Sequence, residues 1–251
     1  MSSHVRTNTA DRVADIEIWR PEKKNALTQE MYAAMGDALL RAEADPDVRV
    51  VLLHGQQDCF TAGNDLHDFL EVSHGSGVGA PAPRFLDIIA AARKPIVAAV
   101  GGVAVGIGTT MLLHCDLVYA ATNARFQMPF VPLGLAPEGG SSLLLPMLAG
   151  YQRAAEMLIL GRPFGAEKGM AAGLVNEVVP PERLLAHARE AALAVAALAP
   201  ESVRITKELL KRPHALAVKE RMAEEIRIFG ERLVSPEAKA AMGAFFQRKK
   251  A

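Results

Sequence analysis

The feature that most restricts the fold is a set of short apolar runs separated by helix-like segments. Val48 to Leu53 is almost continuously apolar, which is typical of a parallel strand covered on both faces. Ile96 to Val100 and Leu117 to Ala121 are further strand candidates, and Val13 to Trp19 alternates as an earlier strand would. Because strands alternate with helices through about residue 121, we expect an α/β fold with crossover connections.

The segments between these strands carry helix signals. Thr28 can cap a helix that runs to about Ala44, and a short helix is expected near Asn64 or Asp65. Ser73 to Pro83 is rich in Gly, Pro and Ser, which predicts a loop that could give access to a site. Further helices are expected over Phe85 to Ala92 and from about Gly106, after a turn at Gly101 and Gly102.

After Gly140 the balance shifts toward helix. A short strand is expected over Val175 to Val179, and almost everything from Glu182 onward is helical in pattern. We therefore divide the chain into a core over residues 1–195 and a helical C-terminal region over 196–251 that covers the site or mediates assembly. Candidate helices before this region are Ser141 to Leu148, Gln152 to Leu160 and Ala166 to Ala172.

Composition limits the classes of partner. The 251 residues carry a formal net charge of zero, so the strongly basic surface of a nucleic-acid-binding protein is not indicated. Two cysteines, Cys59 and Cys115, fit a reducing compartment rather than a disulfide framework, and the polar N-terminus lacks a signal core. The apolar run from Ile96 to Leu113 reads as a buried strand, turn and helix rather than a membrane span. We expect a cytoplasmic protein.

Common catalytic and cofactor motifs have little support. Gly106 to Met111 begins like a dinucleotide fingerprint but lacks its last small residue, and there is no Walker loop or serine nucleophile elbow. His67, His74, His114 and Cys115 have no zinc-ligand spacing, and His114 with Cys115 is better explained by packing. No metal or redox cofactor is expected.

Glu138 is the candidate for acid–base chemistry. It is the only charged side chain between Phe126 and Gln152, in an apolar run rich in Pro and Gly. Burial would raise its pKa, whereas the N-terminus of a helix beginning at Ser141 or Ser142 would lower it, and the sequence does not decide between them. A lone carboxylate of this kind can be a general base, or a helix-capping or salt-bridged glutamate.

Two glycine-containing turns could supply hydrogen-bond donors. Phe60 to Asp65 and Val103 to Gly108 each lead from irregular chain into a helix, whose first N–H groups lack partners within the helix. Two such donors aimed into a shared cleft can form an oxyanion hole, which stabilises charge developing on a carbonyl oxygen. The alternative is that these glycines only permit tight turns.

Taken together, these segments resemble the crotonase, or enoyl-CoA hydratase/isomerase, family. The resemblance covers about residues 10 to 250 in the right order and is carried jointly by its blocks. Asn25 to Leu27 and Ala172 to Val175 also fit. The main blocks are Phe60 to Asp65, Lys94 to Asp116 and Phe126 to Gly140.

The resemblance implies a fold, an assembly and a chemistry. The fold would be an α/β spiral of repeated ββα units, as in ClpP and crotonase, with a helical C-terminal region. The protein would form homotrimers or hexamers (dimers of trimers) and would act on acyl-CoA thioesters, so that coenzyme A arrives as part of the substrate. Backbone amides of Asn64 and Ile107 would hold an enolate oxygen. CoA would lie near Lys24, Ala26, Ala62 and Asp65, and its phosphates near Lys249, in one subunit or a neighbour.

Departures from the family pattern indicate the reaction. Hydratases of this family use two glutamates, at positions where this chain has Thr110 and Met128-Pro129-Phe130. Leu133 to Ser142 instead resembles the peroxisomal-type Δ3,Δ2-enoyl-CoA isomerases, in which a glutamate at the place of Glu138 is the single catalytic base. The resemblance therefore implies an isomerase of fatty acid β-oxidation type that shifts a C3–C4 double bond to C2–C3.

In this reading Glu138 removes a proton from C2 and returns it at C4, while an apolar wall excludes water. The wall residues are equally well explained as core; they are Phe126, Met128, Phe130 and Leu135. The alternatives are an enoyl-CoA hydratase, another crotonase reaction such as thioester hydrolysis, and a non-catalytic acyl-CoA-binding protein.

Overall fold

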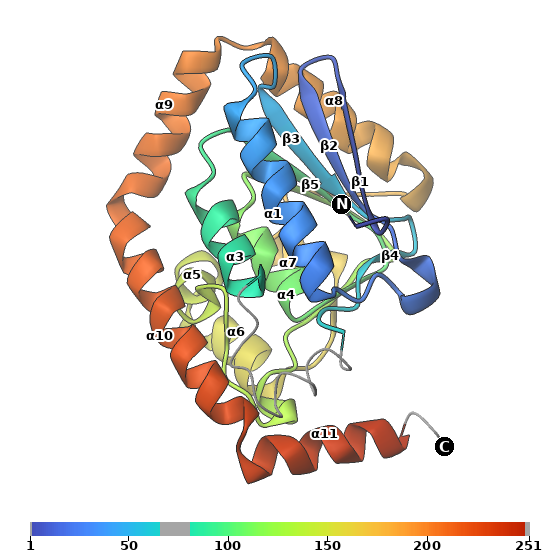
Figure 1. The fold of residues 1–251 in the computed structure, drawn as a ribbon, viewed down its shortest axis with the longest axis vertical. Helices are drawn as coiled ribbons and strands as arrows, with labels where there is room; N and C mark the ends of the chain where they lie inside the picture. Colours follow the sequence, from blue (N-terminus) through green and yellow to red (C-terminus); the bar gives the residue numbers. More distant parts are fainter. Residues whose placement is uncertain (1, 66–80, 249–251) are drawn as a thin grey trace.

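Two sheets form the framework of the computed structural model, which describes residues 2–65 and 81–248 (Figure 1). In the larger sheet the strands lie in the order β1-β2-β3-β5-β7-β10, and only the β1–β2 pair is antiparallel. These strands are β1 (Val5–Ala10), β2 (Val13–Ile18), β3 (Val50–His54), β5 (Ile96–Val100), β7 (Leu117–Ala121) and β10 (Glu177–Val179).

The smaller sheet has the order β4-β6-β8-β9, with the first three strands parallel. Each of the pairs β3–β4, β5–β6 and β7–β8 places its first strand in the larger sheet and its second in the smaller one. The chain therefore winds through the two sheets in a repeat of two strands. This arrangement confirms the expected α/β fold with crossover connections. The strands of this sheet are β4 (Cys59–Thr61), β6 (Val103–Val105), β8 (Arg125–Gln127) and β9 (Phe164–Gly165).

Burial on both faces explains why β3 reads as a continuous apolar run. Val51 and Leu53 belong to the main core cluster with α1 (Gln29–Ala44) and α3 (Pro81–Ala91). Val50 and Leu52 point to the other face, where α8 (Leu184–Ala197) packs on the sheet through its buried Leu and Ala side chains. Because side chains alternate along a strand, a strand sandwiched in this way needs apolar residues at every position.

The start of α1 agrees with the sequence-based expectation, whereas the start of α3 does not. Thr28 accepts a hydrogen bond from the Met31 N–H at 3.3 Å and begins α1, as its sequence predicts. The expectation of a loop through Pro83 is wrong at its end, because Pro81 to Pro83 form the first turn of α3. Prolines are tolerated there since the first helical N–H groups have no partner within the helix. Residues 73–80 of that loop, and the helix expected after Asp65, lie outside the described residues.

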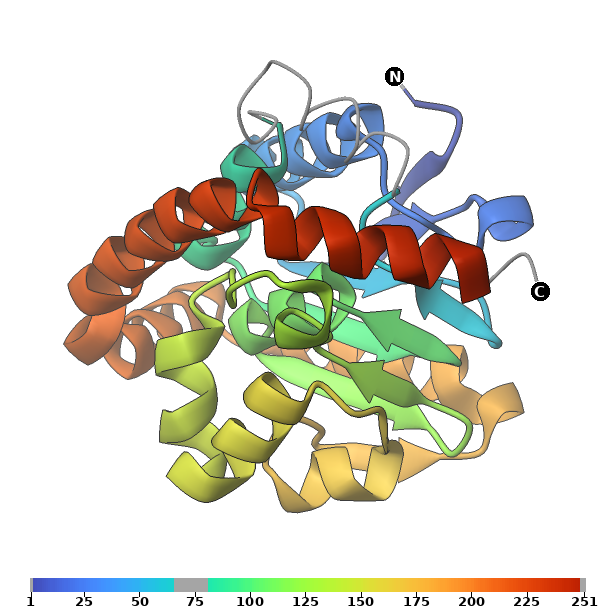
Figure 2. The same cartoon turned by 90° about the horizontal axis from the view of Figure 1, so that it is seen from below.

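The C-terminal half is largely helical. Figure 1 shows α9 and α10 running along one side of the molecule, and Figure 2 shows α11 continuing across an adjacent side. The helix expected over Gln152 to Leu160 is α6 followed by a π-helical turn, η4. The elements are α4 (Ile107–Thr110), η2 (Met111–His114), η3 (Val131–Leu133), α5 (Ser141–Ala149), α6 (Tyr151–Ala155), η4 (Glu156–Leu160), α7 (Ala166–Ala171), α9 (Pro200–Lys211), α10 (Ala215–Leu233) and α11 (Pro236–Arg248), with further short turns at η1 (Pro21–Lys23), η5 (Pro181–Arg183) and η6 (Arg212–His214).

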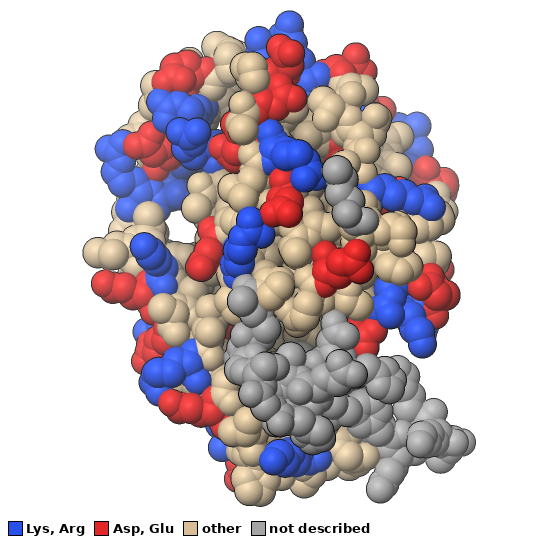
Figure 3. Space-filling model, viewed as in Figure 1, with Lys and Arg blue, Asp and Glu red and all other residues tan. Residues whose placement is uncertain are grey.

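The surface fits the balanced composition. Figure 3 shows Lys and Arg side chains intermingled with Asp and Glu over the face it displays. Over the described ranges, the helices are all too short or too polar to cross a membrane.

Candidate active site

Glu138 lies in the turn that leads into α5. Glu138 is only 8% exposed. Its carboxylate accepts a hydrogen bond from the hydroxyl of Thr110, the last residue of α4. Gly139 takes a positive φ of 68°, and a side-chain carbon added there would lie 3.2 Å from Thr110 Cβ. Glycine favours this left-handed conformation and leaves room for the close contact with Thr110. The turn that carries Glu138 therefore packs directly against α4.

A neutral histidine forms a hydrogen bond with the same turn. His114 in η2 is 3% exposed, and its Nε2 lies 2.8 Å from the Gly139 carbonyl oxygen. Because a carbonyl oxygen only accepts, this nitrogen carries the proton. Burial lowers the pKa of His114 to about 4, so it is uncharged at neutral pH. The packing role expected for His114 is what the structure shows.

Burial decides the ionisation of Glu138. The loss of solvent raises its pKa to about 8, the hydrogen bond from Thr110 opposes that rise, and the nearby carboxylate of Glu225 adds to it. Burial is the largest of these three effects, and it outweighs the hydrogen bond from Thr110. A carboxyl group with a pKa near neutrality can take up and return a proton under physiological conditions.

Ile107 begins the helix whose end contacts Glu138. In α4 the N–H groups of Thr109 and Thr110 both donate to the Gly106 carbonyl oxygen, at 2.8 and 3.0 Å. Ile107 is the first helical residue, so its own N–H has no acceptor within the helix. The amide of Ile107 and the side chain that orients Glu138 are thus one turn apart on a single buried helix.

Asn64 lies on a segment beside the start of α4. It forms an isolated parallel bridge with Leu27, whose N–H donates to Gly63 O at 2.8 Å and whose carbonyl accepts from Asp65 N at 2.9 Å. Since the residues that flank Asn64 make both bonds, its own N–H points away from Leu27. A side-chain carbon at Gly63 would lie 2.6 Å from the Val105 carbonyl oxygen, so this strand end lies directly against the segment that enters α4.

Comparison with known proteins places this geometry in a family. Residues 8–251 match the family described as Enoyl-CoA hydratase/isomerase. The chain belongs to the enoyl-CoA hydratase/isomerase family. The expected crotonase fold is confirmed by a crystal structure of an enoyl-CoA hydratase/isomerase from Pseudoalteromonas atlantica T6c, with a TM-score of 0.93 and 43% identity over 98% of each chain.

Relatives of this family member carry both reaction names. Enoyl-CoA delta isomerase 2 of Homo sapiens is 35% identical over 246 residues, which are 95% of this chain and 62% of that protein. A protein of Rhizobium meliloti named probable enoyl-CoA hydratase is 32% identical over 243 residues, 97% of this chain and 95% of that one. The chain thus spans about three fifths of the human isomerase's length.

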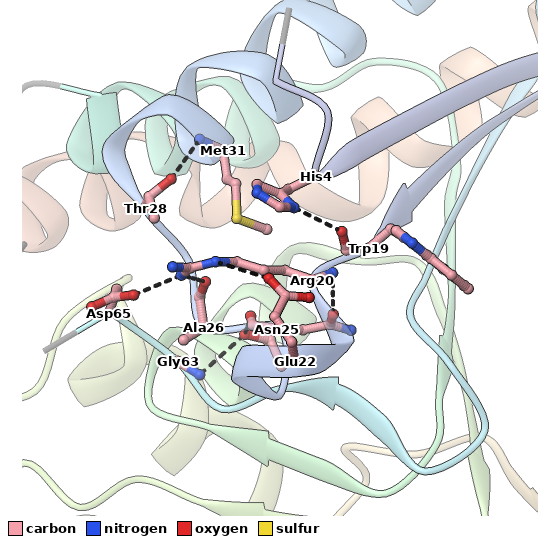
Figure 4. Close-up of polar contacts among 11 residues, drawn as sticks. His4, Trp19, Arg20, Glu22, Asn25, Ala26, Thr28, Met31, Gly63 and Asp65 are labelled. Carbon is pink, nitrogen blue, oxygen red and sulfur yellow. Dashed lines mark hydrogen bonds and ion pairs between the residues drawn. The ribbon is translucent and has the colours of Figure 1, made fainter.

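The two segments expected to contact CoA lie side by side. Figure 4 shows Arg20 reaching both Asp65 and the Ala26 carbonyl oxygen, at 2.6 and 2.9 Å. The Lys24 carbonyl oxygen accepts from Ala62 N–H at 2.9 Å. These contacts join the four residues predicted to line the CoA site, although the Asp65 carboxylate is already paired with Arg20. Lys249 lies outside the described residues.

Phe130 and its neighbours are part of the core. Phe126, Met128, Phe130 and Leu135 are all buried in the main cluster, and Phe130 packs edge-on to Phe229 of α10 at 6.5 Å between ring centroids. The core explanation holds for these side chains, and their service as a wall around substrate remains a prediction.

Three contacting residues were not anticipated from the sequence. Thr110, where the resemblance places a hydratase glutamate, donates a hydrogen bond to Glu138. Tyr32 of α1 is fully buried and donates to the Asn64 side chain at 2.5 Å. Glu225 of α10 accepts from the Gly140 N–H at 2.6 Å. No local pattern signals these pairs, because their partners are 28 to 85 residues away.

The part of the chain that the structure describes holds no cluster of three or more His, Cys, Asp or Glu side chains able to bind a metal ion. The expectation that the chemistry needs no metal or redox cofactor stays a prediction.

Proposed function

We propose that this family member is an enoyl-CoA isomerase that shifts the double bond of an acyl-CoA from C3–C4 to C2–C3. The observation that carries the proposal is the buried Glu138 carboxyl, held by Thr110 on the short helix that also presents the Ile107 amide. The family resemblance puts one of the two hydratase glutamates at the place of Thr110. Here that position supplies a hydrogen-bond donor to Glu138 instead.

In this mechanism the Glu138 carboxylate takes the C2 proton of a 3-enoyl thioester. The electron pair of that C–H bond delocalises over the diene and the thioester oxygen, where the N–H groups of Asn64 and Ile107 stabilise the charge. Protonated Glu138 then gives the same proton to C4, and the double bond becomes C2–C3. One base suffices because C2 and C4 can lie on one face of the substrate within its reach.

Sequence similarity supports the isomerase reaction without deciding it. The human relative named Enoyl-CoA delta isomerase 2 is similar over 95% of this chain, whereas the Rhizobium meliloti relative of comparable identity is named a hydratase. Hydration of 2-enoyl-CoA is therefore the second candidate. It would need a group that activates water, and the hydratase-type glutamates are replaced by Thr110 and by Met128-Pro129-Phe130.

We further propose that the chain works as a homotrimer or a dimer of trimers, with the helices after residue 195 contributing to assembly. Leu209, Leu210 and Leu216 support this, because they are 55–75% exposed on α9 and α10 and would gain from burial between subunits. Sedimentation analysis that finds only monomer would contradict it.

The decisive assay measures purified wild-type protein on 3-enoyl-CoA and 2-enoyl-CoA thioesters of several chain lengths. We expect isomerisation of the 3-enoyl substrates, and its loss in Glu138→Gln and Glu138→Ala with the circular dichroism spectrum unchanged. Near-wild-type turnover in either variant would overturn the role of Glu138. Water addition to 2-enoyl-CoA would favour the hydratase, and binding without any turnover would favour an acyl-CoA-binding protein.

A further inference from the structure

Glu225 occupies a core position on α10. The buried residues of this helix are Met222, Glu225, Phe229 and Leu233, which recur at the three- and four-residue spacing of one helix face. Glu225 is only 4% exposed, so its carboxylate must find polar partners to offset its lost hydration.

Those partners all belong to the turn that carries Glu138. Glu225 Oε2 accepts from the Gly140 N–H at 2.6 Å, while Oε1 accepts from the Ser142 N–H at 2.9 Å and the Ser142 hydroxyl at 2.5 Å. Gly140 is the N-cap of α5 and has no side chain to cap the helix itself. A carboxylate from a distant helix thus does the work of a capping side chain.

We propose that Glu225 is a positioning residue for Glu138: its carboxylate holds the N–H groups of Gly140 and Ser142 and so fixes the turn that carries Glu138. The proposal rests on the proposed role of Glu138 as the acid–base group. Glu225 itself makes no contact with the reacting atoms in this scheme, because it acts through the backbone of Gly140 and through its electric field.

Besides Glu225, the charged groups near the turn bond elsewhere: Lys211 of α9, for example, donates to the His114 carbonyl oxygen at 2.9 Å. From α10, Arg221 approaches the Ser142 hydroxyl at 3.5 Å but pairs with Glu224 at 3.4 Å. From η2, His114 contacts the Gly139 carbonyl oxygen and is neutral. From α4 the contact is the uncharged Thr110, and from α3 the nearest side chain to Gly139 is Leu86. The Glu225 charge accordingly raises the pKa of Glu138, in addition to the larger effect of burial.

The test separates charge from packing. Glu225→Gln keeps the shape, removes the charge and sets an amide group against one of the N–H donors. We expect the pH midpoint of Glu138 to fall by about 0.5–1 pH unit, the size expected for one like charge in a protein interior. We also expect kcat at the high-pH plateau to fall about tenfold or more with little change in KM, because the base is less well placed.

Matched variants identify the cause. Glu220→Gln removes a charge from the exposed face of the same helix and should leave both the midpoint and kcat unchanged. Ser142→Ala removes one hydrogen bond but keeps the Glu225 charge, so kcat should fall modestly while the midpoint stays. A role of Glu225 in stability alone predicts a lower melting temperature with no movement of the midpoint.

The midpoint is read directly by 13C NMR of protein labelled at the glutamate carboxyl carbons, with Glu138 assigned by its absence in Glu138→Gln. This measurement needs no substrate, so it tests Glu225 even if wild-type protein fails to isomerise 3-enoyl-CoA and the proposed function falls. An unchanged midpoint in folded Glu225→Gln would overturn the inference. If Glu225→Gln does not fold, Glu225→Asp provides the test. Its charge is kept, so the midpoint of Glu138 should be preserved, whereas its shorter side chain should lower kcat at the high-pH plateau. An unchanged kcat in Glu225→Asp would overturn the inference.

Discussion

The hydrogen bond from Thr110 to Glu138 gives a prediction whose size follows from the structure. Thr110 is fully buried, and its hydroxyl lowers the pKa of Glu138 against the effect of burial. Thr110→Val keeps the side-chain shape and removes the donor. A hydrogen bond to a charged group contributes about 1.5–3 kcal/mol, which corresponds to about 1–2 pH units at roughly 1.4 kcal/mol for each unit.

The sign is upward, because the lost donor stabilised the ionised form. From a pKa of about 8, roughly a tenth of Glu138 is ionised near pH 7, and in Thr110→Val that fraction falls a further ~10- to 100-fold. We expect kcat/KM for 3-enoyl-CoA near neutral pH to fall by about this factor and to recover toward the wild-type value as the pH rises through the new midpoint.

The assay is the pH profile of kcat/KM, with two controls on the same helix. Thr110→Ser retains the hydroxyl and should keep the wild-type midpoint. Thr109→Val removes a neighbouring buried hydroxyl that bonds the Ala104 carbonyl oxygen at 2.6 Å rather than Glu138, and should also keep it. A Thr110→Val midpoint equal to or below that of wild type would refute the reasoning.

Three further outcomes follow from other contacts. Burial raises the pKa of Glu138 from 4.5 to about 8 in the folded protein, so in the unfolded chain this group ionises at lower pH. The free energy of unfolding of wild type therefore falls as the pH rises between these two values. Urea unfolding should show that Glu138→Gln is more stable than wild type by about 3–5 kcal/mol above about pH 8 and equally stable near pH 4. Tyr32→Phe removes the hydrogen bond to the Asn64 side chain and should reduce kcat about fivefold with KM little changed, whereas an unaltered kcat would exclude a positioning role. In the wild-type protein the buried ammonium of Lys207 lies 2.7 Å from Asp116 Oδ2. Asp116→Asn removes this charged partner and should lower the free energy of unfolding by about 3–5 kcal/mol; a loss below about 1 kcal/mol would contradict this.

The strands that were predicted from sequence are those whose burial dictates their composition. β5 and β7 have the predicted bounds, and β3 is shifted by two residues or fewer, because each is covered by helices and needs apolar side chains. β1 was missed, since five of its six residues are exposed and it is held by backbone pairing to β2. β6 was missed because its three residues lie inside a longer apolar run that reads equally well as turn and helix.

The site could be predicted only in part for a related reason. Glu138 stands out locally as a lone charge in an apolar segment, and the glycine turns before Asn64 and Ile107 are visible as turns. Which residues reach Glu138 depends on how distant elements pack. Glu225 shows this limit, because α10 is rich in charged residues and nothing local marks one of its glutamates as buried.

The competition at Glu138 between burial and the helix N-terminus is settled by which carboxylate receives the helix donors. The N–H groups of Gly140 and Ser142, at the start of α5, are directed to Glu225 rather than to Glu138. The positive end of the helix dipole is therefore offset by the Glu225 carboxylate. Glu138 receives a single hydroxyl donor instead, and its pKa rises to about 8. If the same two N–H groups bound Glu138, they would stabilise its anion and leave a base too weak to remove a proton from carbon. The division of donors between the two glutamates thus explains how a carboxyl group beside a helix N-terminus can keep a raised pKa, which the proposed proton transfer requires.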